Sequence, residues 1–194
     1  MGHRHHAGAL AVLMGWVIAA SGADTSVVFK HENKPQNLKA LFERVHHEVH
    51  VKKDNKRAAA LFNSLIPDEA RAKKALKDDI APDTLRQILD MHKMLGGMTE
   101  AGVAKVVAGP AQKAAEVHGA TTEELMLFRE GSVANKEFPG GAKRVARQAL
   151  RPGMTFYAVY YLEPGKKVAM QYHLLYWDGR QWAMLGPAWR VLKR

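Results

Sequence analysis

Two histidines four residues apart, His46 and His50, are the first candidates for chemistry in this sequence. On a helix this spacing places both imidazoles on one face, where they can share a zinc ion. The metalloprotease signature His-Glu-x-x-His is not met, because Val51 follows His47-Glu48 at the place of the second histidine. Two ligands without a third make a poor site. We therefore treat His46 and His50 as weak metal candidates on a partly solvated helix face.

His173 is the second candidate, because aromatic and apolar residues flank it in a predicted strand. A buried neutral imidazole at this place can orient a ligand or act as a general base. The alternative is a core histidine bonded to the backbone, or a histidine exposed on the sheet face. General-base catalysis would need an Asp or Glu within hydrogen-bond reach of His173. His92 lies on an apolar helix face, where packing is the simpler interpretation.

Other kinds of chemistry find little support in the sequence. The 194 residues contain no cysteine, which excludes disulfides, thiol catalysis and cysteine-based metal sites. The glycine pairs at 96–97 and 140–141 lack the spacing and the Lys-Ser/Thr ending of a phosphate-binding loop. No serine has the context of a nucleophile elbow. The sequence predicts no cofactor, and it favours a non-catalytic role without deciding against an enzyme.

The formal net charge of +10 comes partly from two basic runs, at 52–57 and 143–151. Positive charge of this kind attracts anions such as nucleic acids, acidic polymers and anionic lipid head groups. No zinc finger, RNA-binding sheet signature or helix-turn-helix pattern accompanies the runs. We therefore expect solvated faces or weak contact with an anionic surface, and no specific nucleic acid.

Residues 1–23 have the three regions of a secretory signal peptide: a basic start, the apolar run 7–20, and small residues before a cleavage point. The apolar run is shorter than the roughly 20 residues of a membrane-spanning helix. We expect export to the periplasm or the cell exterior, with the signal either cleaved or kept as an anchor. After cleavage, no later segment is long and apolar enough to span a membrane.

The remaining chain is predicted to be a polar lead-in, 24–34, followed by a single α+β domain, 35–194. Its first part, 35–97, is a helical layer, because apolar residues recur there at helical spacing. Pro35 suits a first helical turn, Asp83 is the expected cap of the last helix, and Gly96-Gly97 stops that helix.

The second part, 98–194, is predicted to run strand, helix and antiparallel meander. We expect a strand at 112–118, a helix capped by Thr121 and Glu124 that runs to Phe138, and a basic helix at 142–150. Three strands follow, at 155–162, 168–177 and 181–185, and 188–192 is a bulged continuation of the last one. The sheet is expected to be curved and packed on helices.

The turn Asp178-Gly179 predicts a two-residue hairpin in which Leu175 faces Trp182. Strand alternation then places Gln171 and His173 on the same face as Trp182. Both faces of the meander are mainly apolar or aromatic. A sheet packed on one side only would have one polar face, so either both faces are covered or one lines a cavity or a partner interface.

The order of elements and the segment 177–182, with a tryptophan at each end, resembles exported NTF2-like or cystatin-like α+β domains. The resemblance covers about residues 100–194 and implies a curved sheet that wraps a helix and can enclose a ligand. NTF2-like enzymes place an Asp–His pair in that space, and here only His173 is a candidate, with no matching acid. The stretches 138–141 and 185–190 are similar to exported bacterial proteins, which implies no activity.

These observations predict an exported, non-catalytic binding domain that holds a small apolar ligand or a protein partner against an aromatic sheet face. The expected ligand-binding residues are Tyr160, Gln171, His173 and Trp182. One alternative is an NTF2-like enzyme with His173 as general base, and another is a structural protein of the cell envelope. A binding domain predicts a closed pocket beside the four residues, whereas a structural protein predicts no cavity. A homodimer is left open.

Overall fold

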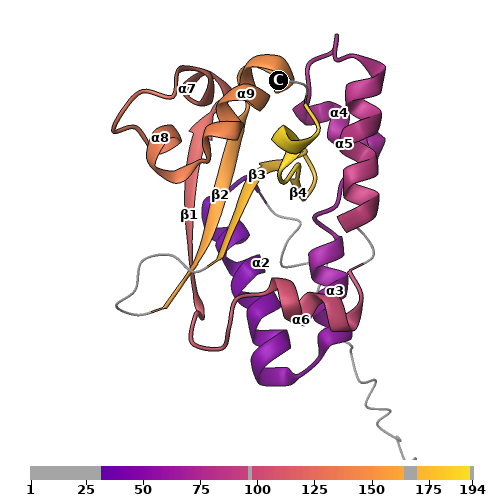
Figure 1. Ribbon diagram of the computed structural model, residues 1–194. Coiled ribbons are helices and arrows are strands. Elements are labelled where there is room, and N and C mark those ends of the chain that lie inside the picture. Colours follow the sequence, from indigo (N-terminus) through magenta and orange to yellow (C-terminus); the bar gives the residue numbers. More distant parts are fainter. Residues whose placement is uncertain (1–31, 96–97, 164–169, 193–194) are drawn as a thin grey trace, which may run out of the picture.

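The computed structural model describes residues 32–95, 98–163 and 170–192. These ranges contain eight α-helices, two shorter helical segments and one four-stranded sheet, which confirms the predicted α+β class (Figure 1). The predicted signal peptide and most of the lead-in lie outside the described residues, so export stays a prediction. Within the described ranges, no helix has both the length and the apolar character that crossing a bilayer requires.

The N-terminal half is helical, as predicted. Asp54 and Asp68 cap two of its helices by accepting hydrogen bonds from backbone N–H groups three residues further on. Asp83 does not cap the last helix as predicted, because that helix begins one residue earlier, at Pro82. Gly96 and Gly97 lie outside the described residues. The helical segments are α2 (Pro35–His47), η1 (Glu48–Lys52, a π-helical turn), α3 (Asn55–Asn63), α4 (Glu69–Ala75) and α5 (Pro82–Leu95).

The middle of the chain contains one strand and four short helices: α6 (Glu100–Val106), β1 (Ala114–Thr121), α7 (Thr122–Leu127), α8 (Val133–Glu137) and α9 (Gly140–Gln148). The predicted strand is confirmed as β1, shifted slightly along the chain. The predicted capping box is also present, since Thr121 and Glu124 each accept a hydrogen bond from the other's backbone N–H. The predicted continuous helix to Phe138 is wrong, because Phe128 adopts a left-handed conformation and ends α7.

The sheet has the order β1-β2-β3-β4, and all three strand pairs are antiparallel. Its last three strands are β2 (Thr155–Leu162), β3 (Met170–Trp177) and β4 (Trp182–Met184). The predicted two-residue hairpin is wrong, because Leu175 pairs with Met184 and not with Trp182. The longer turn forms because the Asp178 carboxylate accepts hydrogen bonds from two backbone N–H groups of the turn, at 2.8 and 2.9 Å.

A β-bulge in β3 decides which side chains share a face of the sheet. The register shifts between Tyr157 and Val159 of β2, so His173 and Leu174 of β3 together oppose one residue of β2. Leu174 has a φ of 56°, in the left-handed region. The extra residue reverses the alternation between the two halves of β3. The predicted placement of His173 on the face of Trp182 is therefore wrong.

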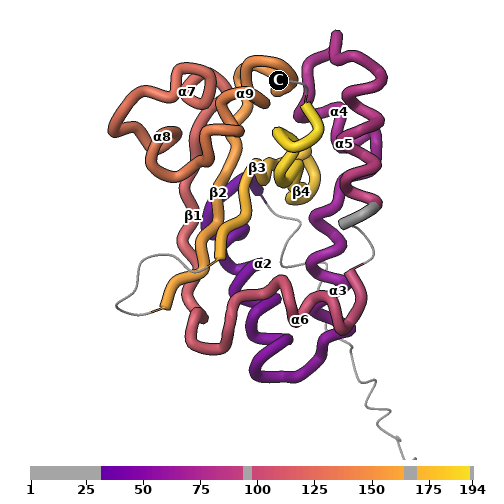
Figure 2. The backbone as a smooth tube through the Cα atoms, viewed as in Figure 1, coloured from indigo at the N-terminus to yellow at the C-terminus, as the bar shows by residue number. Residues whose placement is uncertain are grey.

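Helices cover both faces of the sheet, which is one of the two arrangements expected from its two apolar faces. One core packs α2, α3 and α6 against Tyr157, Val159, Tyr161, Leu175 and Trp182. The other core packs α4, α5, α7, α8 and α9 against Phe156, Ala158, Tyr160, Leu174 and Tyr176. Figure 2 follows the chain to its yellow C-terminal segment, which lies beside α5 and completes the second core.

The C-terminal segment is not the predicted continuation of the last strand. Residues Ala188–Arg190 form a short 3-10 helix, η2. Gly186 has a φ of 58°, and Pro187 has no N–H to donate to a strand ladder, so the chain turns away from the sheet. Trp189 then packs on the start of α9. A Cβ atom at Gly141 would lie 2.7 Å from Cδ1 of Trp189, so only glycine fits at this contact.

A buried ion pair joins α4 to the turn between β3 and β4. Nε of Arg71 donates to Oδ2 of Asp178 at 2.6 Å, and the Asp178 side chain is only 2% exposed. The same guanidinium donates to the carbonyls of Trp182, Ser64 and Ile66. Burial raises the pKa of Asp178, but the hydrogen bonds from Arg71 and the turn outweigh this effect and leave the pKa below its usual value.

Candidate functional site

A pocket of about 330 Å³ lies at the edge of β3 that β4 leaves free. Because β4 pairs only with residues 175–177, the earlier part of β3 faces α3, α5 and α6 across this space. The walls are mainly apolar and aromatic, and they include Phe62, Val106, Tyr172 and Trp189. The hydroxyl of Tyr172 donates to the carbonyl of Val106, which links β3 to α6 beside the pocket. Pockets of this size and character are typical of small-molecule sites.

His92 projects from α5 into the lining of this pocket and is 2% exposed. Burial lowers its pKa to about 4, and a hydrogen bond with the backbone of Leu185 opposes the shift. The Nε2 atom is buried and has no hydrogen-bond partner. A buried polar atom without a partner costs roughly 1–3 kcal/mol, so the native fold tolerates it at a real expense of stability.

His173 lines the same pocket from the bulge of β3. Its ring contacts the rings of Phe138, Tyr160 and Trp189, with centroid distances of 6.1–6.2 Å. Burial lowers its pKa to about 4, so the imidazole is neutral at neutral pH. Its Nε2 atom, like that of His92, is buried without a partner. Two such atoms in one pocket are the strongest indication of a ligand in the described part of the chain.

The structure brings together some of the predicted ligand-binding residues and separates others. Gln171 and His173 both line the pocket. Tyr160 pairs directly with Gln171 and shares its face, but its hydroxyl donates to the carbonyl of Glu137 and it does not line the pocket. Trp182 lies in the core on the opposite face and does not line it either. His92 also lines the pocket, although its sequence pattern predicted only a packing residue.

The alternative with His173 as a general base requires a nearby carboxylate. No Asp or Glu is among the described residues that line the pocket. Among these residues the pocket therefore lacks the acid partner that the alternative needs.

The two metal candidates are brought together, but the Nε2 atom of each ring is already hydrogen-bonded. The rings of His46 and His50 lie 4.5 Å apart. Nε2 of His46 bonds to the carbonyl of Gly109 at 3.0 Å, and Nε2 of His50 bonds to that of Ala108 at 2.7 Å. A carbonyl only accepts, so both Nε2 atoms carry the proton. Within the described residues no group of three or more potential metal ligands occurs. The pair therefore anchors α2 and η1 to the segment after α6.

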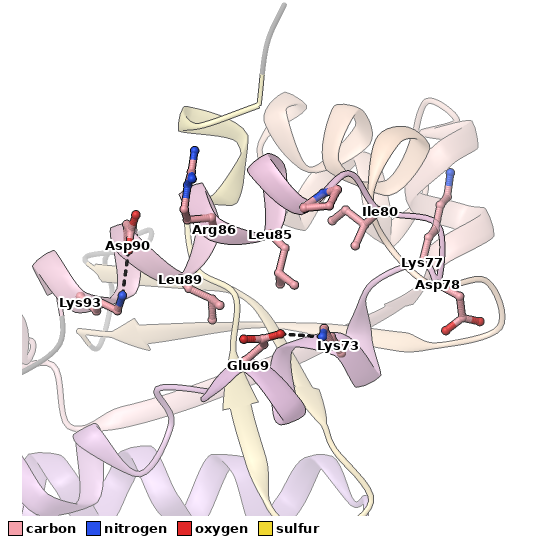
Figure 3. A pocket seen from close by; sticks show the side chains of 11 residues that line it. Glu69, Lys73, Lys77, Asp78, Ile80, Leu85, Arg86, Leu89, Asp90 and Lys93 are labelled. Carbon is pink, nitrogen blue, oxygen red and sulfur yellow. Dashed lines mark hydrogen bonds and ion pairs between the residues drawn. The ribbon is translucent and has the colours of Figure 1, made fainter.

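A second hollow, of about 560 Å³, lies between α4 and α5 (Figure 3). Leu85 and Leu89 form part of its floor. Two ion pairs form within its rim, Glu69 with Lys73 at 2.5 Å and Asp90 with Lys93 at 2.9 Å. None of the buried, unpartnered polar atoms among the described residues lies in this groove. It therefore offers no specific recognition element comparable with the two histidines.

The basic runs are also partly occupied by internal contacts. Arg57 pairs with the buried carboxylate of Glu48, which Arg44 contacts as well, at 2.5 Å. Lys143 lies over the ring of Phe128, and Arg151 pairs with Asp78. Some of the basic side chains in these runs therefore connect parts of the fold to one another.

Comparisons of the chain with protein-family models, with curated proteins and with solved structures gave no match. The resemblance to NTF2-like and cystatin-like domains therefore stays an expectation.

Proposed function

We propose that this protein binds a small, mainly apolar molecule in the pocket at the free edge of β3. The observation that carries the proposal is the pair of buried Nε2 atoms, on His92 and His173, that have no partner. Both histidine residues line the same apolar pocket. Buried polar groups are hydrogen-bonded in the great majority of proteins, so a ligand that supplies the missing partners explains their presence.

The tautomer of His92 indicates which group the ligand offers. The backbone N–H of Leu185 already donates to the carbonyl of Leu174, so its carbonyl is the atom available to His92. A neutral imidazole that donates through one nitrogen keeps the other as an acceptor. Nε2 of His92 is therefore a buried acceptor without a partner, in a residue that lines the apolar pocket. The favoured ligand has an apolar body and a hydrogen-bond donor such as a hydroxyl group.

Calorimetric titration with two neutral probes tests this proposal. We expect 2-naphthol to bind about five to ten times more tightly than 2-methoxynaphthalene, because one neutral hydrogen bond contributes about 1 kcal/mol. In His92→Leu the two probes should bind equally well. Val106→Phe fills the pocket and should abolish binding of both. Native mass spectrometry of the purified chain would also reveal a retained ligand, or the homodimer that the sequence leaves open.

Two control variants make the outcome specific. Val133 is 45% exposed on α8 and does not line the pocket, so Val133→Phe should bind like the wild type. Trp182→Phe changes the predicted residue on the opposite face and should also leave binding unchanged. Equal affinity of the two probes for the wild type would contradict the role of His92. Binding that survives Val106→Phe would contradict the location of the site.

A further inference from the structure

Arg190, at the end of η2, is the one charged side chain among the described residues that line the pocket. It is exposed, whereas the two histidines are more deeply placed. No carboxylate of the described residues lies within ion-pair distance of it. Arg71 and Arg151, in comparison, are each paired with an aspartate. The guanidinium of Arg190 is therefore free to pair with a ligand at the mouth of the pocket.

The rest of the lining does not offset this charge. No acidic residue is among the described residues of the pocket wall. Burial lowers the pKa of both His92 and His173 to about 4, so neither carries charge at neutral pH. The pocket thus combines apolar walls, two neutral hydrogen-bonding groups and one cation. A cation on the ligand would meet repulsion there, and an anion would meet attraction.

The backbone that carries Arg190 is held in place before any ligand binds. Its N–H donates to the carbonyl of Pro187 at 2.9 Å. The carbonyl of the preceding residue, Trp189, accepts from Nη2 of Arg144 at 2.5 Å. The ring of Trp189 rests on Gly141 of α9. A guanidinium on a fixed backbone loses less freedom on binding, and its planar geometry matches a carboxylate.

We propose that the ligand is a small organic acid, with its apolar body between β3 and the helices and one carboxylate paired with Arg190 at the mouth. The proposal rests on the proposed function, because it assigns the charge of a ligand for the same pocket.

A matched pair of probes tests the sign of the charge. Calorimetric titration at pH 7.5 with 2-naphthoate and 2-naphthamide compares an anion with a neutral molecule of nearly the same shape. We expect the acid to bind about tenfold more tightly in low salt, the effect of one charge-assisted hydrogen bond at the low end of its range. The preference should shrink in high salt, because the mouth is open to screening ions. Arg190→Gln should remove the preference and leave the affinity for the amide unchanged.

Arg180→Gln is the control, because Arg180 is also exposed and near β4 but does not line the pocket. This variant should keep the preference for the acid. If the amide binds as tightly as the acid, or if Arg190→Gln keeps the preference, the inference about charge is overturned while the pocket remains. If neither probe binds and 2-naphthol does not bind either, the proposed function fails as well.

Discussion

The pH dependence of stability provides a direct test of the buried state of His92. Its pKa is about 4 in the folded protein, compared with about 6.5 for an ordinary histidine. As the pH falls below about 6.5, His92 therefore becomes protonated in the unfolded chain while it stays neutral in the folded protein. The contribution of His92 to stability is fully present above pH 6.5 and is lost as the pH falls towards 4.

The magnitude follows from the two pKa values. One pH unit corresponds to about 1.4 kcal/mol for each proton taken up, so lowering the pH from 7.5 to 5 removes about 2 kcal/mol of stability through His92 alone. His173 shifts in the same direction. Because its pKa in the folded protein is also about 4, the same relation gives it a comparable loss of stability at low pH.

The assay is urea unfolding at pH 7.5 and pH 5.0, followed by circular dichroism. For each protein we take the difference between its free energies of unfolding at pH 7.5 and pH 5.0. Other titrating groups contribute equally to this pH difference in the wild type and in a variant, so a comparison of the two isolates the contribution of His92. For His92→Leu we expect this difference to be about 2 kcal/mol smaller than in the wild type. His47→Leu is the control, since His47 is half-buried and lies outside the pocket. An unchanged pH difference in His92→Leu would refute the reasoning.

Two further predictions concern contacts that hold the site in shape. Asp178→Ala should cost about 3–5 kcal/mol in urea unfolding, because it leaves the Arg71 guanidinium without its buried partner. Replacing both residues with apolar ones should cost less than this single change; a larger cost would contradict the account. Gly141→Ala should cost about 1–3 kcal/mol, because the added methyl group displaces the ring of Trp189. At Gly140 a Cβ atom meets nothing within 4 Å, so Gly140→Ala should be far milder; equal losses would refute the steric argument.

The local elements were largely predictable, because their signals are local. Thr121 and Glu124 are three residues apart, and a capping box needs nothing more distant. The strands 155–162 and 170–177 follow from a high content of aromatic and β-branched residues. The apolar composition of both sheet faces predicted that both are covered or that one lines a cavity or a partner interface, and helices cover both.

The site was only partly predictable, because it depends on features that no pattern of residue types encodes. The bulge at His173 and Leu174 reverses strand alternation, and neither residue marks a bulge in the way a glycine does. The turn after Trp177 is longer than predicted, because the Asp178 carboxylate accepts hydrogen bonds from two backbone N–H groups of the loop. His92 was interpreted as packing, since a missing hydrogen-bond partner depends on the tertiary surroundings and not on sequence spacing.

The position of the sheet strands in the chain has a consequence for protein synthesis. Part of the surface that packs against α2 to α5 belongs to β2, β3 and β4, which begin only at Thr155. A ribosome therefore completes the apolar stripes of four helices long before it makes the strands that bury them. The nascent chain must keep this part of their apolar surface exposed while residues 96–154 are made. Such a chain is a natural client for a chaperone that shields apolar segments until the last strands emerge.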